Sequence, residues 1–438
     1  MIYNDSQKKA VMHTTGPMMV LAGPGSGKTA VITGRTCQLV TSGISASRIL
    51  VVTFTRAAAK EMKERYLKAM GKTSTQVTFG TFHGVFYAIL RHTYRMSGNN
   101  ILSEEEKKRL MRELVNHYAR DLEEEDLEEN LAREISTVKN NQIPLEHYYS
   151  ACMPQEKFRE IYEAYEKWRK ENKKLDFDDL MVQCKRLFLE RPEVLRAWQQ
   201  KFQYILIDEF QDISPVQYEI VRMLALPENN LFIVGDDDQS IYQFRGAKPE
   251  IMLNFRKDYP QSGQVLLNDN FRSTTQIVEA AGRVIARNKT RFPKNIIARG
   301  GDGALVQSLE FPDQQQECAY ILREIQNWQA RGGSLRQVAV IYRTNTQPRV
   351  VIQKLMEYNL PFRVRDQVPN LFQHWIARDL FCYMRLAMGS GLRKDLLPVL
   401  NRPKRYLSRE CLNDERISWE YMLDFYKDKR YVCDRIER

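Results

Sequence analysis

Residues 22–29 read Ala-Gly-Pro-Gly-Ser-Gly-Lys-Thr and directly follow the apolar run Met18-Met19-Val20-Leu21. This order predicts a short buried strand that enters a glycine-rich turn, after which Lys28 and Thr29 open a helix. Such a turn directs several backbone N–H groups at one point, which suits the phosphates of a nucleotide. We expect Lys28 to reach the β- and γ-phosphates and Thr29 to ligate Mg²⁺. The predicted ATP site therefore contains Ala22, Gly23, Gly25, Ser26, Gly27, Lys28 and Thr29.

The composition indicates a globular chain of at least two domains, because 438 residues with 43% hydrophobic exceed one ordinary core. No stretch approaches the ~20 apolar residues of a membrane span, so no membrane partner is expected. Seven scattered cysteines argue against a disulfide framework or a zinc site and predict a cytoplasmic protein. The formal net charge of +11 favours a polyanionic partner, although an ordinary basic protein shows the same balance.

Three further apolar runs have the pattern of buried parallel strands. They are Ile49–Phe54, Tyr204–Ile207 and Leu231–Val234, and each is followed by a polar or glycine-containing turn. Ligands of open parallel sheets bind at the carboxyl ends of the strands. The predicted fold class is therefore α/β, with its chemistry at that edge of the sheet.

Helical patterns interrupt and follow this sheet. Residues 87–176 carry leucines at helical spacing among charged residues, for example over Glu104–Arg120 and Gln155–Asn172. A second α/β unit is predicted from about Gln264, with strands at Val265–Leu267 and Val338–Tyr342 around the helix Thr275–Asn288. From Trp375 to the last residue the pattern is helical again.

Two carboxylates follow the predicted strand Tyr204–Ile207. Asp208, at the strand end, can hold the Mg²⁺ that Thr29 also ligates. Glu209 can orient and deprotonate a water molecule that attacks the γ-phosphate. An Asp-Glu pair is often only a solvated turn, but a buried strand before it and a phosphate loop upstream favour a catalytic function.

A second polar segment follows the strand Leu231–Val234 and reads Gly235-Asp236-Asp237-Asp238-Gln239-Ser240-Ile241-Tyr242-Gln243-Phe244. Gln239 is predicted to sense the γ-phosphate through a hydrogen bond. Tyr242 and Phe244 alternate and can stack bases, a contact that depends little on nucleotide sequence. The alternative, that one of these rings belongs to the core, stays open.

Together with Asn270-Phe271-Arg272-Ser273-Thr274, these motifs stand in the order seen in superfamily 1 DNA helicases. The chain resembles the UvrD/Rep type from Asn4 to about Ser408. The resemblance implies RecA-like motor domains that bind ATP and Mg²⁺ and move 3′ to 5′ along single-stranded DNA. Its expected DNA partner is a single strand or a 3′-tailed duplex.

The resemblance also implies roles for single residues. Gln7 would read the adenine edge, Phe271 would stack on adenine where the family has tyrosine, and Arg272 would reach the γ-phosphate from the second motor domain. For DNA it implies contacts by Phe54, Thr55, Thr81, His83, Tyr242, Phe244, Arg343 and Asn345. A satisfied core histidine is an equally good interpretation of His83.

The resemblance implies a first RecA-like domain at 1–86 and 177–263, a helical insertion at 87–176, a second RecA-like domain at 264–374 and the start of a second insertion at 375–438. We find neither of the two motifs that the family carries after this second insertion. The second motor domain is therefore expected to be incomplete, and the chain to be an N-terminal fragment or to need a partner. Weak ATP turnover and no unwinding by the chain alone are expected.

Two other functions are compatible with a phosphate-binding loop. A kinase using the same phosphate loop would need no aromatic pair after Gln239, so the sequence argues against it. An ATP-gated DNA-binding or regulatory subunit without motor activity stays open. DNA-stimulated ATP hydrolysis distinguishes a motor from such a subunit.

Overall fold

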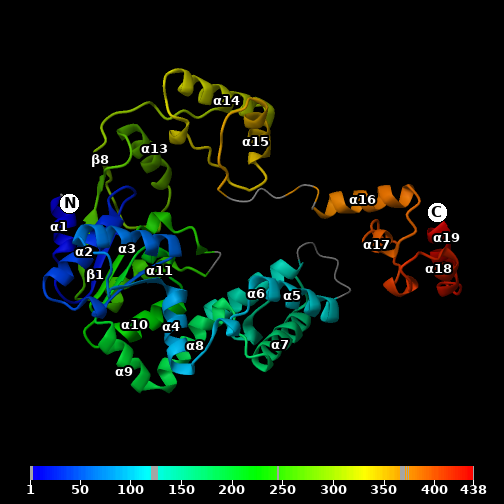
Figure 1. Ribbon diagram of the computed structural model, residues 1–438, viewed down its shortest axis with the longest axis horizontal. Helices are drawn as coiled ribbons and strands as arrows, with labels where there is room; N and C mark the ends of the chain where they lie inside the picture. The colour runs from blue at the N-terminus through cyan, green and yellow to red at the C-terminus, as the bar shows by residue number, and fades with distance from the viewer. Residues whose placement is uncertain are drawn as a thin grey trace. The chain divides into compact units, whose positions relative to one another are not determined.

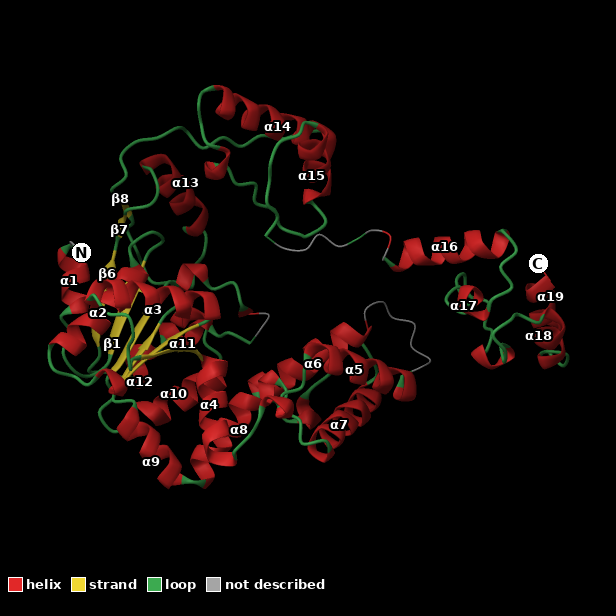
Figure 2. Ribbon diagram, in the orientation of Figure 1, coloured by secondary structure: helices red, strands yellow, loops and turns green. Residues whose placement is uncertain are grey.

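A computed structural model describes residues 3–119, 127–243, 246–365, 370, 372 and 374–437. The chain forms two compact units, residues 1–306 and 307–438. Figure 1 follows the chain from the N-terminus to the C-terminus, and Figure 2 shows that the described strands lie in the first unit. No helix among the described residues is long and apolar enough to cross a membrane.

A 6-stranded parallel sheet forms the centre of the first unit, in the order β3-β2-β4-β5-β1-β6. Three of its strands are buried over their whole length, which explains why they read as continuous apolar runs. The predicted α/β class with a parallel sheet is confirmed. The strands are β1 (Met18–Ala22), β2 (Ile49–Thr53), β3 (Thr78–Thr81), β4 (Tyr204–Ile207), β5 (Leu231–Gly235) and β6 (Gly263–Leu267).

Alternate residues of each strand supply two apolar clusters, one on each face of the sheet. Met18 and Val20 pack with α1 (Asp5–Val11), α2 (Lys28–Thr41) and α3 (Arg56–Met70). Met19 and Leu21 belong to the other cluster. The helices that contribute to this second cluster are α4 (Phe82–Tyr94), α8 (Phe177–Glu190), α10 (Pro215–Ala225), α11 (Pro249–Leu253) and α12 (Phe255–Asp258), and α9 (Pro192–Lys201) packs beside them.

The segment between α4 and α8 forms a helical insertion with a core of its own. Its helices are α5 (Glu104–Tyr118), α6 (Leu127–Asn141) and α7 (Gln155–Glu171), whose inward residues include Leu110, Ile135, Phe158 and Tyr165. The predicted helices Glu104–Arg120 and Gln155–Asn172 correspond to α5 and α7.

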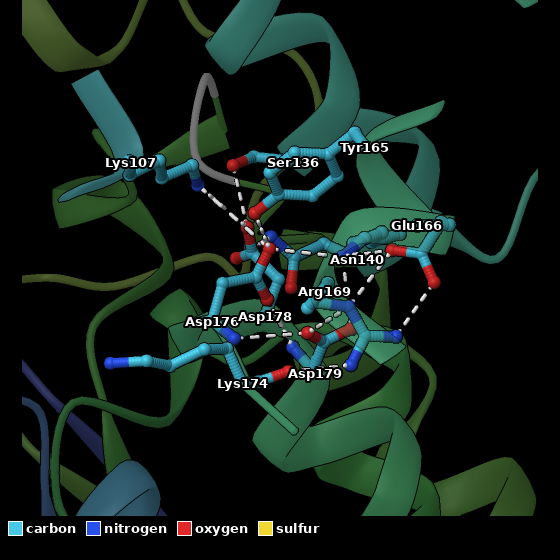
Figure 3. A network of polar contacts seen from close by, with 11 residues as sticks. Lys107, Ser136, Asn140, Tyr165, Glu166, Arg169, Lys174, Asp176, Asp178 and Asp179 are labelled. Carbon is cyan, nitrogen blue, oxygen red and sulfur yellow. Dashed lines mark hydrogen bonds and ion pairs between the residues drawn. The ribbon is translucent and has the colours of Figure 1, made fainter. Parts of the chain in front are cut away.

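A buried ionic network joins this insertion to α8, and Figure 3 shows its side chains turned toward one another. Lys139 Nζ on α6 lies 2.7 Å from Glu166 Oε1 on α7. The same ammonium lies 2.9 Å from carboxylate oxygens of Asp176 and Asp179 at the start of α8. Arg169 Nε lies 2.9 Å from the other oxygen of Asp179. Burial and the adjacent Asp176 charge raise the pKa of Asp179 to about 7.

The chain after the sheet differs from the sequence prediction. The sequence predicts that Val265–Leu267 belongs to a second sheet, but these residues lie in β6 and pair with β1. They are followed by β7 (Asp269–Asn270), α13 (Thr275–Ile285) and β8 (Ile297–Ala298), and β7 pairs with β8. The prediction of a strand at Val338–Tyr342 is wrong. Its backbone pairs with no described strand, and Ile341 is 92% exposed.

In its described residues, the second unit contains helices and loops. Leu322 and Ile325 of α14 pack against Leu355 of α15. A separate small core around Leu407 and Met422 holds the last helices. The predicted division of this half at residue 375 stays a prediction. The helices are α14 (Gln314–Ala330), α15 (Pro348–Glu357), α16 (Trp375–Ala387), α17 (Arg393–Leu396), α18 (Trp419–Phe425) and α19 (Arg430–Glu437).

The network in Figure 3 predicts that Lys139→Met weakens the attachment of the insertion. The change keeps an unbranched side chain but leaves buried carboxylates without their main cation, which costs about 3–5 kcal/mol. Hydrogen exchange of the α6 and α8 amides measures this loss. Lys108→Met is the control, because that side chain is 61% exposed and its loss changes stability by about 0.5 kcal/mol or less. Unchanged exchange in Lys139→Met would contradict the prediction.

Candidate functional site

The turn after β1 has the backbone of a phosphate-binding loop. Gly25 (φ 66°) and Gly27 (φ 86°) adopt the left-handed conformation that glycine takes without strain. The Ser26 hydroxyl donates a hydrogen bond to the Gly23 carbonyl at 2.7 Å, which fixes the turn. Gly27 provides no side-chain cap for α2, so the first N–H groups of this helix are available to a ligand.

The segment that carries Arg272 lies directly against this loop. Phe271 N donates to Gly25 O at 3.0 Å. A Cβ on Gly25 would lie 2.7 Å from Asn270 Oδ1 and 2.8 Å from Arg272 Cβ, so only glycine permits this approach. Asn270 Oδ1 in turn accepts from the N–H groups of Arg272 and Ser273, each at 2.8 Å. The structure thus brings the predicted γ-phosphate arginine beside the phosphate loop.

Gln7 supports the same loop from α1. Its Nε2 donates to Ser26 O at 2.9 Å, and its Oε1 accepts from Asn4 N at 3.2 Å within a capping box. Asn4 Nδ2 also donates to Asp269 Oδ2 at 2.7 Å. The amide of Gln7 is therefore engaged at both ends by protein groups. Its contact with adenine stays a prediction, as does stacking by Phe271, whose ring is 53% exposed.

The acidic pair after β4 faces the phosphate loop. Glu209 Oε2 lies 3.4 Å from Lys28 Nζ, and this buried ammonium has no hydrogen-bond partner. Asp208 is buried, and its Oδ1 is also without a partner. Burial, and then the Glu209 charge, raise the pKa of Asp208 to about 7. A buried cation and a buried carboxylate with one unpartnered oxygen fit a phosphate and a hard metal ion such as Mg²⁺.

Glu209 has a left-handed backbone, with φ 51°, which is uncommon for a residue with a side chain. Strain of this kind persists where surrounding contacts hold it, and it is frequent at functional sites. Here Gln211 Nε2 donates to Glu209 Oε2 at 3.0 Å. The turn thus aims the Glu209 carboxylate at the phosphate loop.

Sequence reasoning missed two residues of this turn. Gln211 Oε1 accepts from Asp236 N at 2.9 Å, so its amide joins the turn after β4 to the turn after β5. Burial and the Glu209 charge raise the pKa of Asp212 to about 7, and Asp212 Oδ1 has no partner. Both residues lie in the segment that supplied Asp208 and Glu209. Their position in that motif was the available signal.

Gln239 follows β5, the strand between β4 and β1. Its Nε2 donates to Asp236 Oδ2 at 2.6 Å. Because three neighbouring parallel strands end at one edge, Lys28, Glu209 and Gln239 lie on adjacent turns, as the sequence predicted for such a sheet.

An aromatic pair lies at the same edge. The rings of Phe54 and Tyr242 stack with centroids 5.4 Å apart and an interplanar angle of 19°. Both are partly exposed, so the alternative of a core ring does not hold for Tyr242. Phe244 lies outside the described residues.

Thr55 and Thr81 cap the helices that follow β2 and β3. Their hydroxyls accept from Ala58 N at 3.1 Å and from Gly84 N at 3.2 Å. His83 is half-buried, and its ring meets Phe177 edge-on with centroids 5.8 Å apart. Burial lowers the pKa of His83, while the Asp178 charge opposes this shift.

A cavity of about 1010 Å³ opens between this edge and the insertion. Phe54 and His83 line one side. The other side, from α5 and α6, combines Lys107, Arg133 and Asn140 with the carboxylates of Glu104, Glu105, Glu128 and Glu129. The remaining predicted DNA residues, Arg343 and Asn345, lie on an exposed turn of the second unit. In that turn Gln347 Oε1 accepts from the backbone N–H groups of residues 343 and 344.

Comparison with known proteins places the chain in a family. A family model of the UvrD/REP helicase N-terminal domain matches residues 3–260, more than half of the chain. The chain belongs to the UvrD/REP helicase family. A model of the UvrD-like helicase C-terminal domain matches residues 265–431 of this UvrD/REP family member.

Curated relatives of this UvrD/REP family member carry helicase names. It is 38% identical over 421 residues to the "Putative ATP-dependent DNA helicase YjcD" of Bacillus subtilis (strain 168), covering 94% of this chain and 54% of the relative. It is 34% identical over 413 residues to the ATP-dependent DNA helicase PcrA of Staphylococcus aureus (strain Mu50), covering 92% and 56%. The chain spans about half the length of the curated relatives it matches.

The expectation that the family's C-terminal motifs are absent is not borne out. The C-terminal family model covers residues 265–431, so the chain contains this domain and the expected incomplete second domain is unsupported. Short motifs mark only a few positions, whereas the match to the family extends along the whole segment.

The close contact at Gly25 predicts a loss of nucleotide binding in Gly25→Ala. The added Cβ would displace the loop or Arg272, with an overpacking energy of about 1–3 kcal/mol. We expect the Kd for a fluorescent ATP analogue to rise roughly five- to 150-fold. Gly43→Ala is the matched control, because Gly43 (φ 93°) shares the left-handed backbone but has open space around it. Equal Kd changes in both variants would show that the close contact has no part in binding.

Proposed function

We propose that this chain hydrolyses ATP with Mg²⁺ and couples hydrolysis to 3′-to-5′ movement along single-stranded DNA and to duplex unwinding. The observation that carries the proposal is the buried Lys28 ammonium, which faces Glu209 at 3.4 Å and has no hydrogen-bond partner. A cation held in this state at the start of a helix after a glycine-rich turn favours a phosphate ligand. The family membership and the names of the relatives support the same function.

The chain's own groups divide the work of hydrolysis. Lys28 and the first N–H groups of α2 bind the phosphates, while Arg272, beside Gly25, stabilises the charge that develops on the transferred group. Glu209, oriented by Gln211, accepts the proton of the attacking water. Thr29 and Asp208 would hold Mg²⁺, which when bound neutralises charge on the phosphate oxygens.

The proposed DNA site uses the aromatic pair. Phe54 and Tyr242 can each stack a base regardless of its identity, as a translocating protein requires. Thr55 and Thr81 mark helix starts whose N–H groups suit backbone phosphates. Arg343 and Asn345, on an exposed turn of the second unit, are proposed separately to contact DNA. The proposed compartment is the cytoplasm, consistent with seven free cysteines.

ATP hydrolysis by the purified chain, with and without oligo-dT, tests the catalytic assignment. We expect DNA to stimulate hydrolysis, and Glu209→Gln to lower kcat by roughly 10²–10⁴-fold, because the general base is lost. Binding of ATP should persist, since Lys28 remains. Glu228→Gln is the control, because Glu228 is exposed after α10.

Full hydrolysis by Glu209→Gln would reject Glu209 as the base. ATP binding without any turnover in the wild-type chain would reject the proposed hydrolase. Unwinding of a 5′-tailed duplex in preference to a 3′-tailed one would reject the proposed polarity.

The stacked rings predict a specific loss of DNA binding in Phe54→Ala. Base stacking on one ring contributes about 1–3 kcal/mol, so the Kd for oligo-dT should rise roughly five- to 150-fold. Fluorescence anisotropy measures this Kd, and ATP hydrolysis without DNA should change little. Tyr94→Ala is the control, because Tyr94 is a surface ring at the opposite end of α4 from His83. An equal loss in both variants would count against a stacking site.

A further inference from the structure

Among the described residues, Lys294 is a deeply buried cation beside the candidate site. Its side chain is 1% exposed. Its Nζ lies 2.5 Å from Asp236 Oδ1 and 2.5 Å from Asp237 Oδ1. It also lies 2.8 Å from Asp238 Oδ2. One ammonium therefore contacts all three carboxylates of the turn after β5.

Two neighbours of Lys294 bind the same turn. Arg291 donates from Nε and Nη2 to the two oxygens of Asp238, each at 2.7 Å. Phe292 N donates to Asp237 Oδ2 at 2.7 Å. Residues 291–294, which follow α13, thus hold a turn that lies 53 to 58 positions earlier in the chain.

The contact with Asp236 leads directly to Gln239. Lys294 Nζ contacts Oδ1 of the Asp236 carboxylate, and Gln239 Nε2 donates to Oδ2 of the same group at 2.6 Å. The Asp236 side chain is fully buried, and its Oδ1 also accepts from Asp238 N at 3.3 Å. Its orientation therefore depends on Lys294, Gln239 and this backbone N–H. Its backbone N–H is bonded to Gln211, which in turn holds Glu209.

The same segment reaches the phosphate loop at its other end. A Cβ on Gly23 would lie 2.3 Å from Ile296 Cδ1, so the Ile296 side chain rests on the loop backbone. Ile297 then pairs with β7, the strand that leads to Arg272. Residues 291–297 therefore connect the turn that carries Gln239 to the phosphate loop.

We propose that Lys294 is a positioning residue for the proposed ATP hydrolysis, on which this inference rests. It fixes the Asp236 carboxylate, and through it the Gln239 amide, so that Gln239 meets the γ-phosphate of a nucleotide seated on the phosphate loop. Removing the ammonium leaves three carboxylates with Arg291 as their remaining cationic partner among the described residues. The Gln239 side chain then loses its fixed acceptor geometry.

Lys294→Met, Gln239→Ala and the double variant test this relay. A misplacement near 1 Å at a catalytic group lowers rates by up to about 100-fold, so we expect Lys294→Met to lower kcat by roughly 10- to 100-fold. KM for ATP should change by about threefold or less, because Lys28 is untouched. The double variant should be no slower than Gln239→Ala, within about twofold, since both changes remove one interaction.

A binding measurement adds a readout that needs no turnover. The ratio of the Kd for ADP to the Kd for ATPγS reports recognition of the γ-phosphate. Lys294→Met should lower this ratio as Gln239→Ala does, and Lys294→Arg should keep more of it than Lys294→Met. Lys289→Met, an exposed lysine before the same segment, should leave the ratio and kcat unchanged.

An unchanged Kd ratio in Lys294→Met, or losses that multiply in the double variant, would overturn the relay through Gln239. A wild-type chain that binds ATPγS without hydrolysing ATP would reject the proposed function, while the Kd ratios would still decide the role of Lys294. If Lys294→Met does not fold, as judged by circular dichroism, the Kd ratio of Lys294→Arg is compared with that of Gln239→Ala instead. A Lys294→Arg variant with a wild-type ratio would then support positioning by the buried charge, and one with the ratio of Gln239→Ala would overturn it.

Discussion

Everything in the candidate site depends on the parallel register of β4, β5 and β1. Because Ile207 pairs with Ile233 and Leu21 pairs with Gly235, three turns leave the sheet at nearly the same level. Each turn then delivers one kind of group: a cation from the phosphate loop, a carboxylate after β4 and an amide after β5. Shifting any strand by one residue would turn its apolar side chains to the opposite face and dismantle both the core and the site.

The sequence predicted those parts of the molecule that local patterns encode. Continuous apolar runs marked β1, β2, β4 and β5, and the residues after them contained the acids and the glutamine of the site. Lys294 was not predictable in this way, because an isolated lysine between a proline and an asparagine has no local signature. Its importance arises only when the fold places it against Asp236, more than fifty positions away.

In the second half of the chain, a local pattern predicts a strand that does not form. Val338–Tyr342 has the apolar, β-branched composition of a strand, yet a strand forms only where another backbone offers its hydrogen bonds. Val265–Leu267 has a similar composition and finds such a backbone in β1. The composition of both segments is therefore compatible with a strand. The difference between them is that only Val265–Leu267 has a neighbouring strand to pair with.

The stacking of Phe54 on Tyr242 has a consequence for the proposed binding of DNA. In the absence of DNA each ring already covers a face of the other, so an incoming base competes with a contact of about 0.5–1.5 kcal/mol. The two rings must therefore separate before a base can insert between them. A base inserted between the rings would replace that contact with two base–ring contacts of about 1–3 kcal/mol each, so separating the rings offsets only part of the gain. At the proposed DNA site, the two stacked rings therefore bind a base less tightly than two rings that already lie apart would.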